Sequence, residues 1–285
     1  MLKRIAARVA ALLRRPQGVH APQPHAAILD VYVRTAPHPQ NALDVFKGDW
    51  WSQIPRPAGL TAGQLPLFAD SRITWAIPAL GGVAGRSVLE LGPLEAGHTY
   101  MLEQAGARDI FAIEANTRAY LKCLIAKEVV GLHRARFVLG DFEEYLRAPP
   151  QADRFDACLA SGVLYHVRNP VELIHNLARV TDRVFIWTQY YIKERVEAIE
   201  HMKHRFGEEH EAEHAGFRHT LHRYNYGDFL DTTRFAGGSE QYSHWLSRDD
   251  LLGALRHAGF TEIEVGEDDL MHANGPAITL VARKA

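Results

Sequence analysis

Residues 88–98, with the sequence Val-Leu-Glu-Leu-Gly-Pro-Leu-Glu-Ala-Gly-His, decide the fold of this chain. A short apolar strand ends at Gly92, a loop follows, and a helix is predicted from His98 onward. Glycines in such a turn let the backbone approach a ligand closely, and the first N–H groups of the helix attract electron-rich atoms. The stretch therefore predicts a strand–loop–helix unit with a ligand site at the carboxyl end of the strand.

Around this unit, short apolar runs alternate with amphipathic helical stretches. The predicted strands are 87–91, 110–114, 136–139, 155–160 and 183–189, and the predicted helices between them are 98–105, 117–130, 142–146 and 170–180. This alternation implies right-handed crossovers and a parallel sheet covered on both faces. Residues 262–265 and 277–282 add two strands with no helix between them, which predicts a C-terminal antiparallel hairpin. The fold class is α/β: a Rossmann-like, doubly wound and mostly parallel sheet of seven strands.

The chain divides into an extension and a main domain. Residues 1–82 are predicted to form an N-terminal extension rich in proline and glycine, and residues 83–285 the main domain. Residues 190–246 interrupt the alternation after the fifth strand, which is typical of a cap or lid. The chain begins with a basic amphipathic helix. We favour its docking on the domain or on a partner subunit, with binding to a membrane surface, binding to nucleic acid or organelle targeting as alternatives.

Composition narrows the class of protein. With 285 residues, 47% hydrophobic content and a formal net charge of -2, the chain can bury a large core but offers no broad phosphate-binding surface. Cys123 and Cys158 lie among apolar residues and are expected to be reduced. No apolar run is long enough to span a bilayer. A cytoplasmic protein without a transmembrane segment is expected, with a small-molecule partner favoured over nucleic acid.

Two ligand classes use a glycine-containing turn of this kind, namely dinucleotides and S-adenosylmethionine. The dinucleotide fingerprint G-x-G-x-x-G is not met, because position 94 is leucine. Glu95 also lies in the loop, where a carboxylate would repel a pyrophosphate. S-adenosylmethionine carries a cationic sulfonium and no phosphate, so Glu90 and Glu95 are compatible with it. The loop therefore favours S-adenosylmethionine.

The chain resembles the class I S-adenosylmethionine-dependent methyltransferases over residues 86–190 and in the closing hairpin. The similarity rests on LELGPLEAGHT, IFAIEAN, VLGDF and FDACLASGVLYHVRNP, although the first motif lacks the family's middle glycine. The stretch GVLYHVRNP is also similar to the tRNA wobble-uridine carboxymethyltransferases.

This resemblance implies a cofactor site at the carboxyl ends of consecutive strands. Glu90 would organise the methionine end, Glu114 would accept from the ribose hydroxyls, and Asp141 would accept from the adenine amino group. The remaining residues expected to contact the cofactor are Gly92, Gly97, Phe142 and Ser161. Each also has a plain structural alternative: Glu114 a solvated turn residue, Asp141 a helix cap, and Phe142 an ordinary core side chain.

The catalytic candidates follow the fourth strand. Because methyl transfer to a hydroxyl requires loss of a proton, His166 is the candidate base, with Tyr165 as a second catalytic residue and Tyr165 or Tyr190 as its hydrogen-bonding partner. The alternative is a neutral histidine that only fixes the loop before Asn169.

Aromatic and cationic residues elsewhere are candidates for binding the acceptor. Trp50 in the extension, together with Tyr190, Arg223 and Tyr224, would line the substrate pocket, or would only pack the cap on the domain. The stretch EHMKHRFGEEHEAEH (residues 200–214) contains histidine pairs at helical spacing. Because the segment is charged throughout and lacks cysteine, we predict a solvated polar helix and no metal site.

The sequence thus predicts an enzyme that uses S-adenosylmethionine to methylate oxygen on a sugar, polyketide or similar metabolite. The alternatives are a tRNA-modifying (carboxy)methyltransferase and a non-catalytic S-adenosylmethionine-binding protein. An NAD-dependent oxidoreductase is disfavoured by Leu94 and Glu95.

Overall fold

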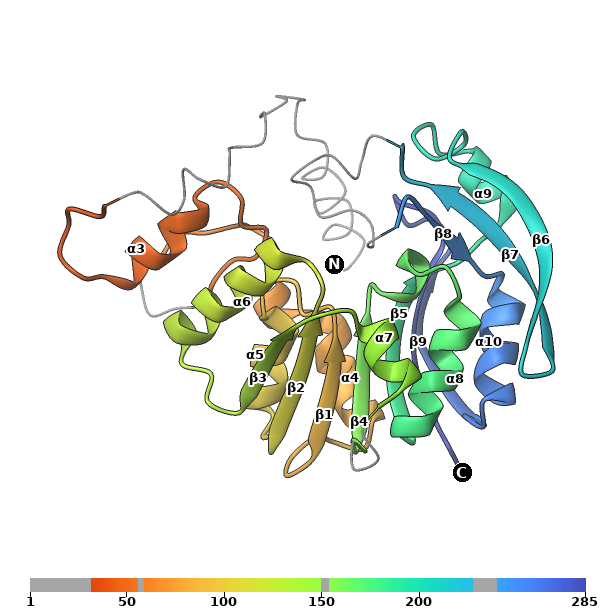
Figure 1. Ribbon diagram of the computed structural model, residues 1–285, viewed down its shortest axis with the longest axis horizontal. Coiled ribbons are helices and arrows are strands. Elements are labelled where there is room, and N and C mark those ends of the chain that lie inside the picture. The colour runs from red at the N-terminus through yellow and green to blue at the C-terminus, as the bar shows by residue number, and fades with distance from the viewer. Residues whose placement is uncertain (1–31, 56–58, 150–153, 228–239) are drawn as a thin grey trace.

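The computed structural model describes residues 32–55, 59–149, 154–227 and 240–285 (Figure 1). The predicted basic helix at the start of the chain lies outside these residues. Within them, no helix combines the length and the apolar character needed to cross a bilayer. Cys123 and Cys158 are free and buried, as predicted.

A seven-stranded sheet organises the molecule, with the strand order β3-β2-β1-β4-β5-β10-β9. Its strands are β1 (Ser87–Leu91), β2 (Asp109–Glu114), β3 (Ala135–Leu139), β4 (Ala157–Ser161), β5 (Arg183–Gln189), β9 (Glu262–Asp269) and β10 (Ala277–Arg283). The first five strands are parallel, and β10 runs antiparallel between β5 and β9. The predicted α/β class, the seven strands and the closing antiparallel hairpin are therefore confirmed.

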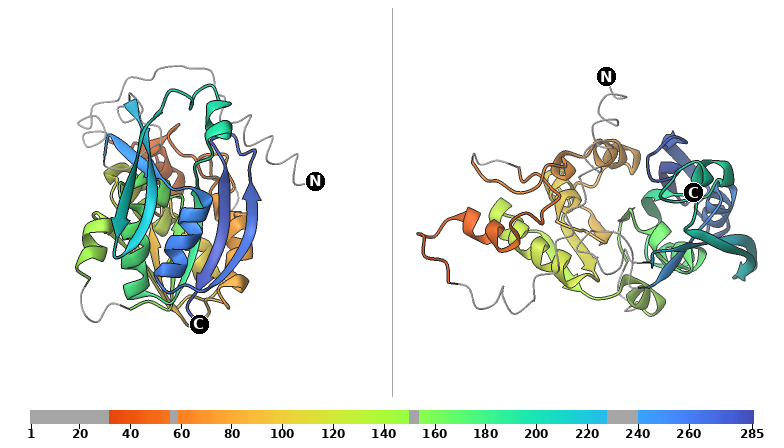
Figure 2. Two further views of the ribbon diagram at one scale, coloured as in Figure 1. Left: turned by 90° about the vertical axis from the view of Figure 1, so that its right-hand side faces the viewer. Right: turned by 90° about the horizontal axis from the view of Figure 1, so that it is seen from above.

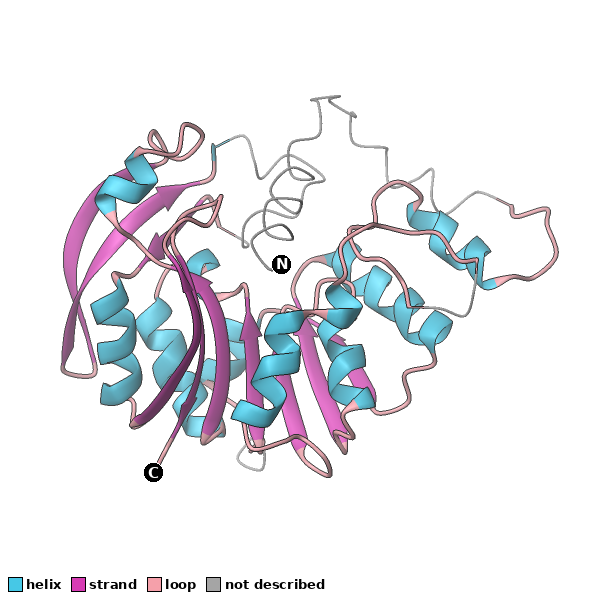
Figure 3. Cartoon of the chain, turned by 180° about the vertical axis from the view of Figure 1, so that it is seen from behind, coloured by secondary structure: helices cyan, strands magenta, loops and turns pink. Residues whose placement is uncertain are grey.

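Helices cover both faces of the sheet (Figure 3). One face packs on α4 (Ser71–Ala79), α5 (Gly97–Gln104) and α6 (Thr117–Val130), and the other on α7 (Phe142–Arg147), α8 (Pro170–Val180) and α10 (Arg248–His257). Side chains that alternate along β1 enter the two cores, so Val88 lies in the first core and Leu89 in the second. The alternation explains why β1 is buried at every position.

The region between β5 and α10 differs from its prediction. Residues expected to form a polar helix instead form strand β6 (Phe206–His214), which pairs with β7 (Phe217–Asn225), and β7 pairs with β8 (Tyr242–Trp245). The helix prediction was wrong because Glu209, Glu211 and Glu213 alternate with His210, Ala212 and His214, a period of two that places the carboxylates on one face of a strand. This three-stranded sheet stands beside α10 (Figure 2), and the short helix α9 (Lys193–Glu197) precedes it.

The described part of the extension contains α3 (Pro39–Leu43), two 3-10 turns at Asp44–Phe46 and Leu67–Ala69, and α4. Helix α4 was not predicted. Asp70 caps it by accepting a hydrogen bond from the backbone N–H of Arg72, but Pro78 inside the helix hides its pattern in the sequence. Helix α3 and the β6–β7 hairpin lie at opposite ends of the molecule (Figure 1).

Candidate functional site

Three carboxylates gather at the carboxyl edge of the sheet. Glu90 lies on β1, Glu114 ends β2, and Asp141 follows β3 by two residues. Because these strands are parallel neighbours, their carboxyl ends meet at one edge, which is where open α/β sheets bind ligands.

Glu90 has one carboxylate oxygen engaged and one without a partner. The hydroxyl of Thr99 on α5 donates to Oε2 at 2.6 Å, whereas Oε1 has no hydrogen-bond partner among the described residues. The side chain is 1% exposed, and burial, together with the nearby charge of Glu114, raises its pKa to about 7. A buried oxygen without a partner is costly unless a ligand supplies a donor, and this oxygen lies at the edge predicted to hold the cofactor.

Glu114 ties the end of β2 to the loop after β1. Its Oε2 accepts from the backbone N–H of Leu94 at 3.1 Å, and its Oε1 accepts from that of Asn116 at 2.9 Å. Burial raises its pKa to about 7. The carboxylate is therefore aimed at the loop, where it has a structural task in addition to the ribose contact that we expect of it.

The loop itself keeps the shape of a glycine turn without the middle glycine. Leu94 and Ala96 adopt positive φ angles of 56° and 65°, next to Gly92 at 64°. Gly97 was predicted to contact the cofactor, but in the structure it allows close packing on Leu67. A Cβ at this position would lie 2.7 Å from the carbonyl oxygen of Leu67. The extension therefore packs directly on the start of α5.

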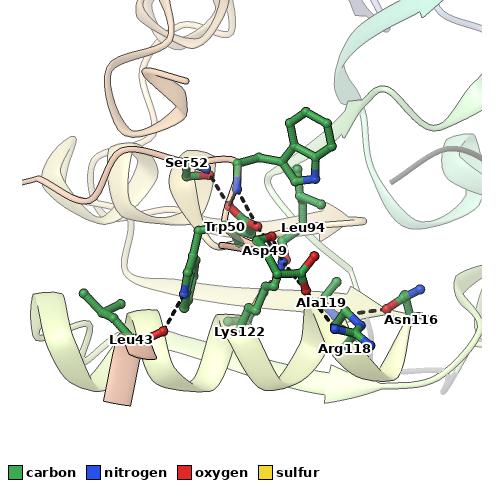
Figure 4. Close-up of polar contacts among 12 residues, drawn as sticks. Leu43, Asp49, Trp50, Ser52, Leu94, Asn116, Arg118, Ala119 and Lys122 are labelled. Carbon is green, nitrogen blue, oxygen red and sulfur yellow. Dashed lines mark hydrogen bonds and ion pairs between the residues drawn. The ribbon is translucent and has the colours of Figure 1, made fainter. Parts of the chain in front are cut away.

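Glu95 faces the extension from the other side of the loop. It is fully buried and accepts from the backbone N–H of Ser52 at 2.7 Å and from Lys122 Nζ at 3.0 Å. Lys122 on α6 also pairs with Asp49 at 3.3 Å (Figure 4). Trp50 lies in the same layer, with its indole N–H donating to the carbonyl of Leu43 at 2.8 Å and its side chain 7% exposed.

Asp141 caps a helix and Phe142 packs against the core, which are the structural alternatives considered for them. Both residues also lie at the edge of the sheet that is expected to bind the cofactor. Asp141 Oδ1 accepts from the backbone N–H of Glu143 at 2.7 Å and so caps α7. Phe142 is partly buried and packs against the core on the α8 side of the sheet. Neither contact prevents the cofactor role, since each residue leaves part of its side chain exposed.

The candidate catalytic residues lie directly after β4. Ser161 ends β4, and Gly162 turns the chain at a φ angle of 79° into the 3-10 turn Leu164–His166. His166 Nδ1 lies 2.7 Å from the hydroxyl oxygen of Tyr226. Although His166 is partly exposed, desolvation of its ring lowers its pKa to about 3, so the imidazole is neutral at physiological pH.

Comparisons with known proteins agree with this geometry. A family described as "Methyltransferase domain" matches residues 89–183, which include the three carboxylates and His166. Residues 89–183 therefore match a methyltransferase domain, and the sheet has the Rossmann-like fold of class I S-adenosylmethionine-dependent methyltransferases. A solved structure of the N-terminal domain of EvdMO1, determined in the presence of SAH and D-fucose, has the same fold; it is 22% identical, with a TM-score of 0.65, and the match covers 86% of this chain and 95% of that one.

Curated relatives of this methyltransferase domain include tRNA U34 carboxymethyltransferases. The enzyme from Shewanella pealeana is 28% identical over 139 residues, covering 48% of this chain and 40% of the relative. The enzyme from Idiomarina loihiensis is 29% identical over 103 residues, covering 35% of this chain and 31% of the relative. The chain thus spans about a third of the length of these relatives, and the similarity noted in GVLYHVRNP extends well beyond that stretch.

Around the methyltransferase domain, the structure separates residues predicted to share a substrate pocket. Arg223 and Tyr224 are neighbours on β7, so their side chains leave opposite faces of the strand. Tyr224 stacks on Trp245 with ring centroids 5.5 Å apart and lies 5.3 Å from Tyr226, beside the catalytic loop. The Arg223 guanidinium lies over the ring of Tyr242 at 4.0 Å.

The two predicted hydrogen-bonding partners of His166 make other contacts in the structure. Tyr190 donates its hydroxyl proton to Asp268 Oδ1 at 2.6 Å, and Tyr165 contacts His166 through its ring, with centroids 4.1 Å apart. Tyr226 is the residue that bonds to the imidazole, 60 positions along the chain. No local pattern could have revealed this pair, because it depends on how β8, which pairs with β7, packs against the 3-10 turn Leu164–His166.

Arg72 is a further residue that the sequence did not indicate. Its guanidinium lies 4.4 Å from the ring centroid of Trp187 on β5 and forms an ion pair with Asp70. The ring of Trp187 lies 5.9 Å from that of Tyr165. Helix α4 thereby brings a cation, already paired with a carboxylate, to the vicinity of the 3-10 turn Leu164–His166.

Proposed function

We propose that this chain transfers the methyl group of S-adenosylmethionine to an oxygen of a small molecule, such as a sugar, a polyketide or a similar metabolite. The observation that carries the proposal is the neutral imidazole of His166 just after β4, inside the matched segment and beside the aromatic rings of Tyr165 and Tyr226.

The residues at the sheet edge fit the cofactor. Glu90 Oε1 is buried without a hydrogen-bond partner in the part of the chain that the structure describes, and Glu114 and Asp141 present carboxylates along the same edge. We propose that Gly92, Gly97, Phe142 and Ser161 complete this site as the resemblance implies. When bound, S-adenosylmethionine supplies an activated methyl group on a cationic sulfonium, which neighbouring carboxylates stabilise.

The chain's own contribution is to position the acceptor. Holding two reactants in near-attack geometry can lower a barrier by about 7–11 kcal/mol, and we propose that His166 and Tyr165 contact the acceptor oxygen. A small pocket beside this loop is lined in part by Leu164, Tyr165 and Trp245.

The domain organisation supports a lid near this site. We propose that residues 1–82 act as an extension that braces the cofactor loop, and that residues 190–246 act as a cap that supplies Tyr224 and Tyr226. We propose a structural role near the pocket, and no direct contact with the acceptor, for Trp50, Tyr190 and Arg223. Each of these side chains already contacts another residue of the protein.

The test is to incubate purified protein with methyl-labelled S-adenosylmethionine and a panel of monosaccharides and phenolic polyketides, and to analyse the products by mass spectrometry. We expect a product that has gained one methyl group, and a His166→Gln variant that loses activity while binding S-adenosylhomocysteine as the parent does. Binding of the cofactor without turnover of any acceptor would instead favour a non-catalytic binding protein.

A second candidate is (carboxy)methylation of tRNA, favoured by the similarity to the tRNA U34 carboxymethyltransferases over 139 residues. It predicts that tRNA shifts on a gel and that the shift weakens steeply as salt increases. The formal net charge of -2 does not favour tRNA binding. If tRNA does not shift on the gel even at low salt, this candidate is refuted.

A further inference from the structure

A line of three hydrogen-bonded polar groups ends at the imidazole of His166, the candidate catalytic residue. The hydroxyl oxygen of Ser243 lies 3.0 Å from that of Tyr226, which lies 2.7 Å from His166 Nδ1. Ser243 is fully buried and Tyr226 is 3% exposed. The strands β7 and β8 pair beside these residues, which fixes the two hydroxyl groups relative to each other.

The protons of this line can be arranged in two ways. In the first, Ser243 donates to Tyr226, and Tyr226 donates to His166 Nδ1, so the imidazole proton is on Nε2. In the second, His166 donates from Nδ1 and Tyr226 donates to Ser243. The proton of the Ser243 hydroxyl then has no acceptor among the described residues, since no other contact of its Oγ is present there.

The first arrangement is the more stable of the two. It gives both hydroxyl protons an acceptor, whereas the second leaves the fully buried proton of Ser243 without one among the described residues, at a cost that typically exceeds the gain from one hydrogen bond. The carbonyl of Tyr165 does not change this balance, because it lies 3.5 Å from the Tyr226 oxygen, much farther than His166.

We propose that Tyr226, whose hydroxyl oxygen also accepts from Ser243, holds His166 as the tautomer with its proton on Nε2, so that His166 donates a hydrogen bond to the acceptor oxygen instead of removing a proton from it. This inference rests on the proposed function and names its substrate class: an acceptor oxygen that ionises by itself, as in a phenol or enol. An N–H donor holds such an anionic oxygen in place, but it gives no help to a sugar hydroxyl, which must still lose its proton.

The transfer step then balances without a base. The ionised acceptor oxygen attacks the methyl carbon, an O–C bond forms, the C–S bond breaks and its electron pair remains on sulfur. The negative charge of the oxygen and the positive charge of the sulfonium are both neutralised, and no proton leaves the site.

The tautomer is measurable directly by nitrogen NMR of histidine-labelled protein, with the His166 signal assigned by its loss in His166→Gln. We expect a protonated Nε2 and an unprotonated Nδ1 in the parent. Ser243→Ala is the matched control: Tyr226 still donates to Nδ1, so the tautomer is unchanged. A protonated Nδ1 in the parent, or a switch of tautomer in Ser243→Ala, would overturn the proposal.

Activity supplies the second readout. With two phenols of similar shape but different pKa, the pH at which kcat/KM levels off should move with the pKa of the phenol, and Tyr226→Phe should lower kcat/KM by roughly tenfold. A profile fixed at one pH for both phenols would show a base on the enzyme and refute the inference. If no acceptor is methylated but Nε2 carries the proton, the proposed function fails and the tautomer assignment stands.

Discussion

The buried ion pair between Lys122 and Glu95 offers a quantitative test of how the extension is held on the methyltransferase domain. Lys122 is 4% exposed and Glu95 is fully buried, with Nζ and Oε1 3.0 Å apart. Replacing Lys122 by methionine keeps much of the side-chain volume but leaves the carboxylate without a counter-charge. Breaking a buried pair from one side typically costs about 3–5 kcal/mol.

The lower end of this range applies here. Glu95 keeps two backbone donors, the N–H groups of Trp51 and Ser52, which continue to stabilise the negative charge. Lys122→Met should therefore lower the free energy of unfolding by about 3 kcal/mol. At roughly 2–4 °C for each kcal/mol in a protein of this size, the expected fall in Tm is about 6–12 °C at neutral pH.

The assay is thermal and urea unfolding of four proteins. Lys122→Met/Glu95→Gln should recover much of the loss, because the glutamine carbonyl can still accept from the two backbone N–H groups without a buried charge. Lys47→Met is the matched control, since Lys47 is 79% exposed and should change stability by less than about 0.5 kcal/mol. If Lys122→Met costs under about 1 kcal/mol, or the double variant is no more stable than the single one, the pair does not hold the extension as argued.

Three further outcomes follow from the site. Gly97→Ala should destabilise the protein by about 1–3 kcal/mol in chemical denaturation, because the new Cβ collides with the backbone of Leu67; unchanged stability would contradict this packing. Glu114→Gln should weaken binding of S-adenosylmethionine in calorimetry by roughly 10–100-fold through loss of charged hydrogen bonds, whereas the exposed Glu128→Gln should bind as the parent does. The raised pKa values of Glu90 and Glu114, both about 7, mean that the cofactor-free protein prefers the protonated carboxyls, so its stability should fall as pH rises from about 4.5 to 7. A cationic cofactor favours the ionised forms, so its affinity should rise with pH up to about 7 and then level off; equal affinity at pH 6 and pH 8 would show that neither carboxyl faces it.

The sequence predicted those parts of the fold that depend on local patterns. Buried parallel strands appear as apolar runs, and each ends at a recognisable turn, so β1 to β5 were placed to within one or two residues. The β6–β7 hairpin was missed because charge density was weighed above the alternation of Glu209 and His210 with their neighbours. Neither the Tyr226–His166 contact nor the positive φ of Leu94 has a local signal, because strand pairing and packing determine both.

The structure also changes the reason for excluding a dinucleotide. In the sequence, Glu95 stood in the loop as a charge opposed to a pyrophosphate, but Lys122 neutralises it on the side that faces the extension. The opposing charge is instead that of Glu90, whose buried Oε1 has no hydrogen-bond partner among the described residues. Glu114 does not discriminate between the two ligands, because dinucleotide sites also have a carboxylate at the end of the second strand. We therefore expect Glu90 to favour a cationic cofactor at this loop, and reversing its charge should be required before any dinucleotide binds there.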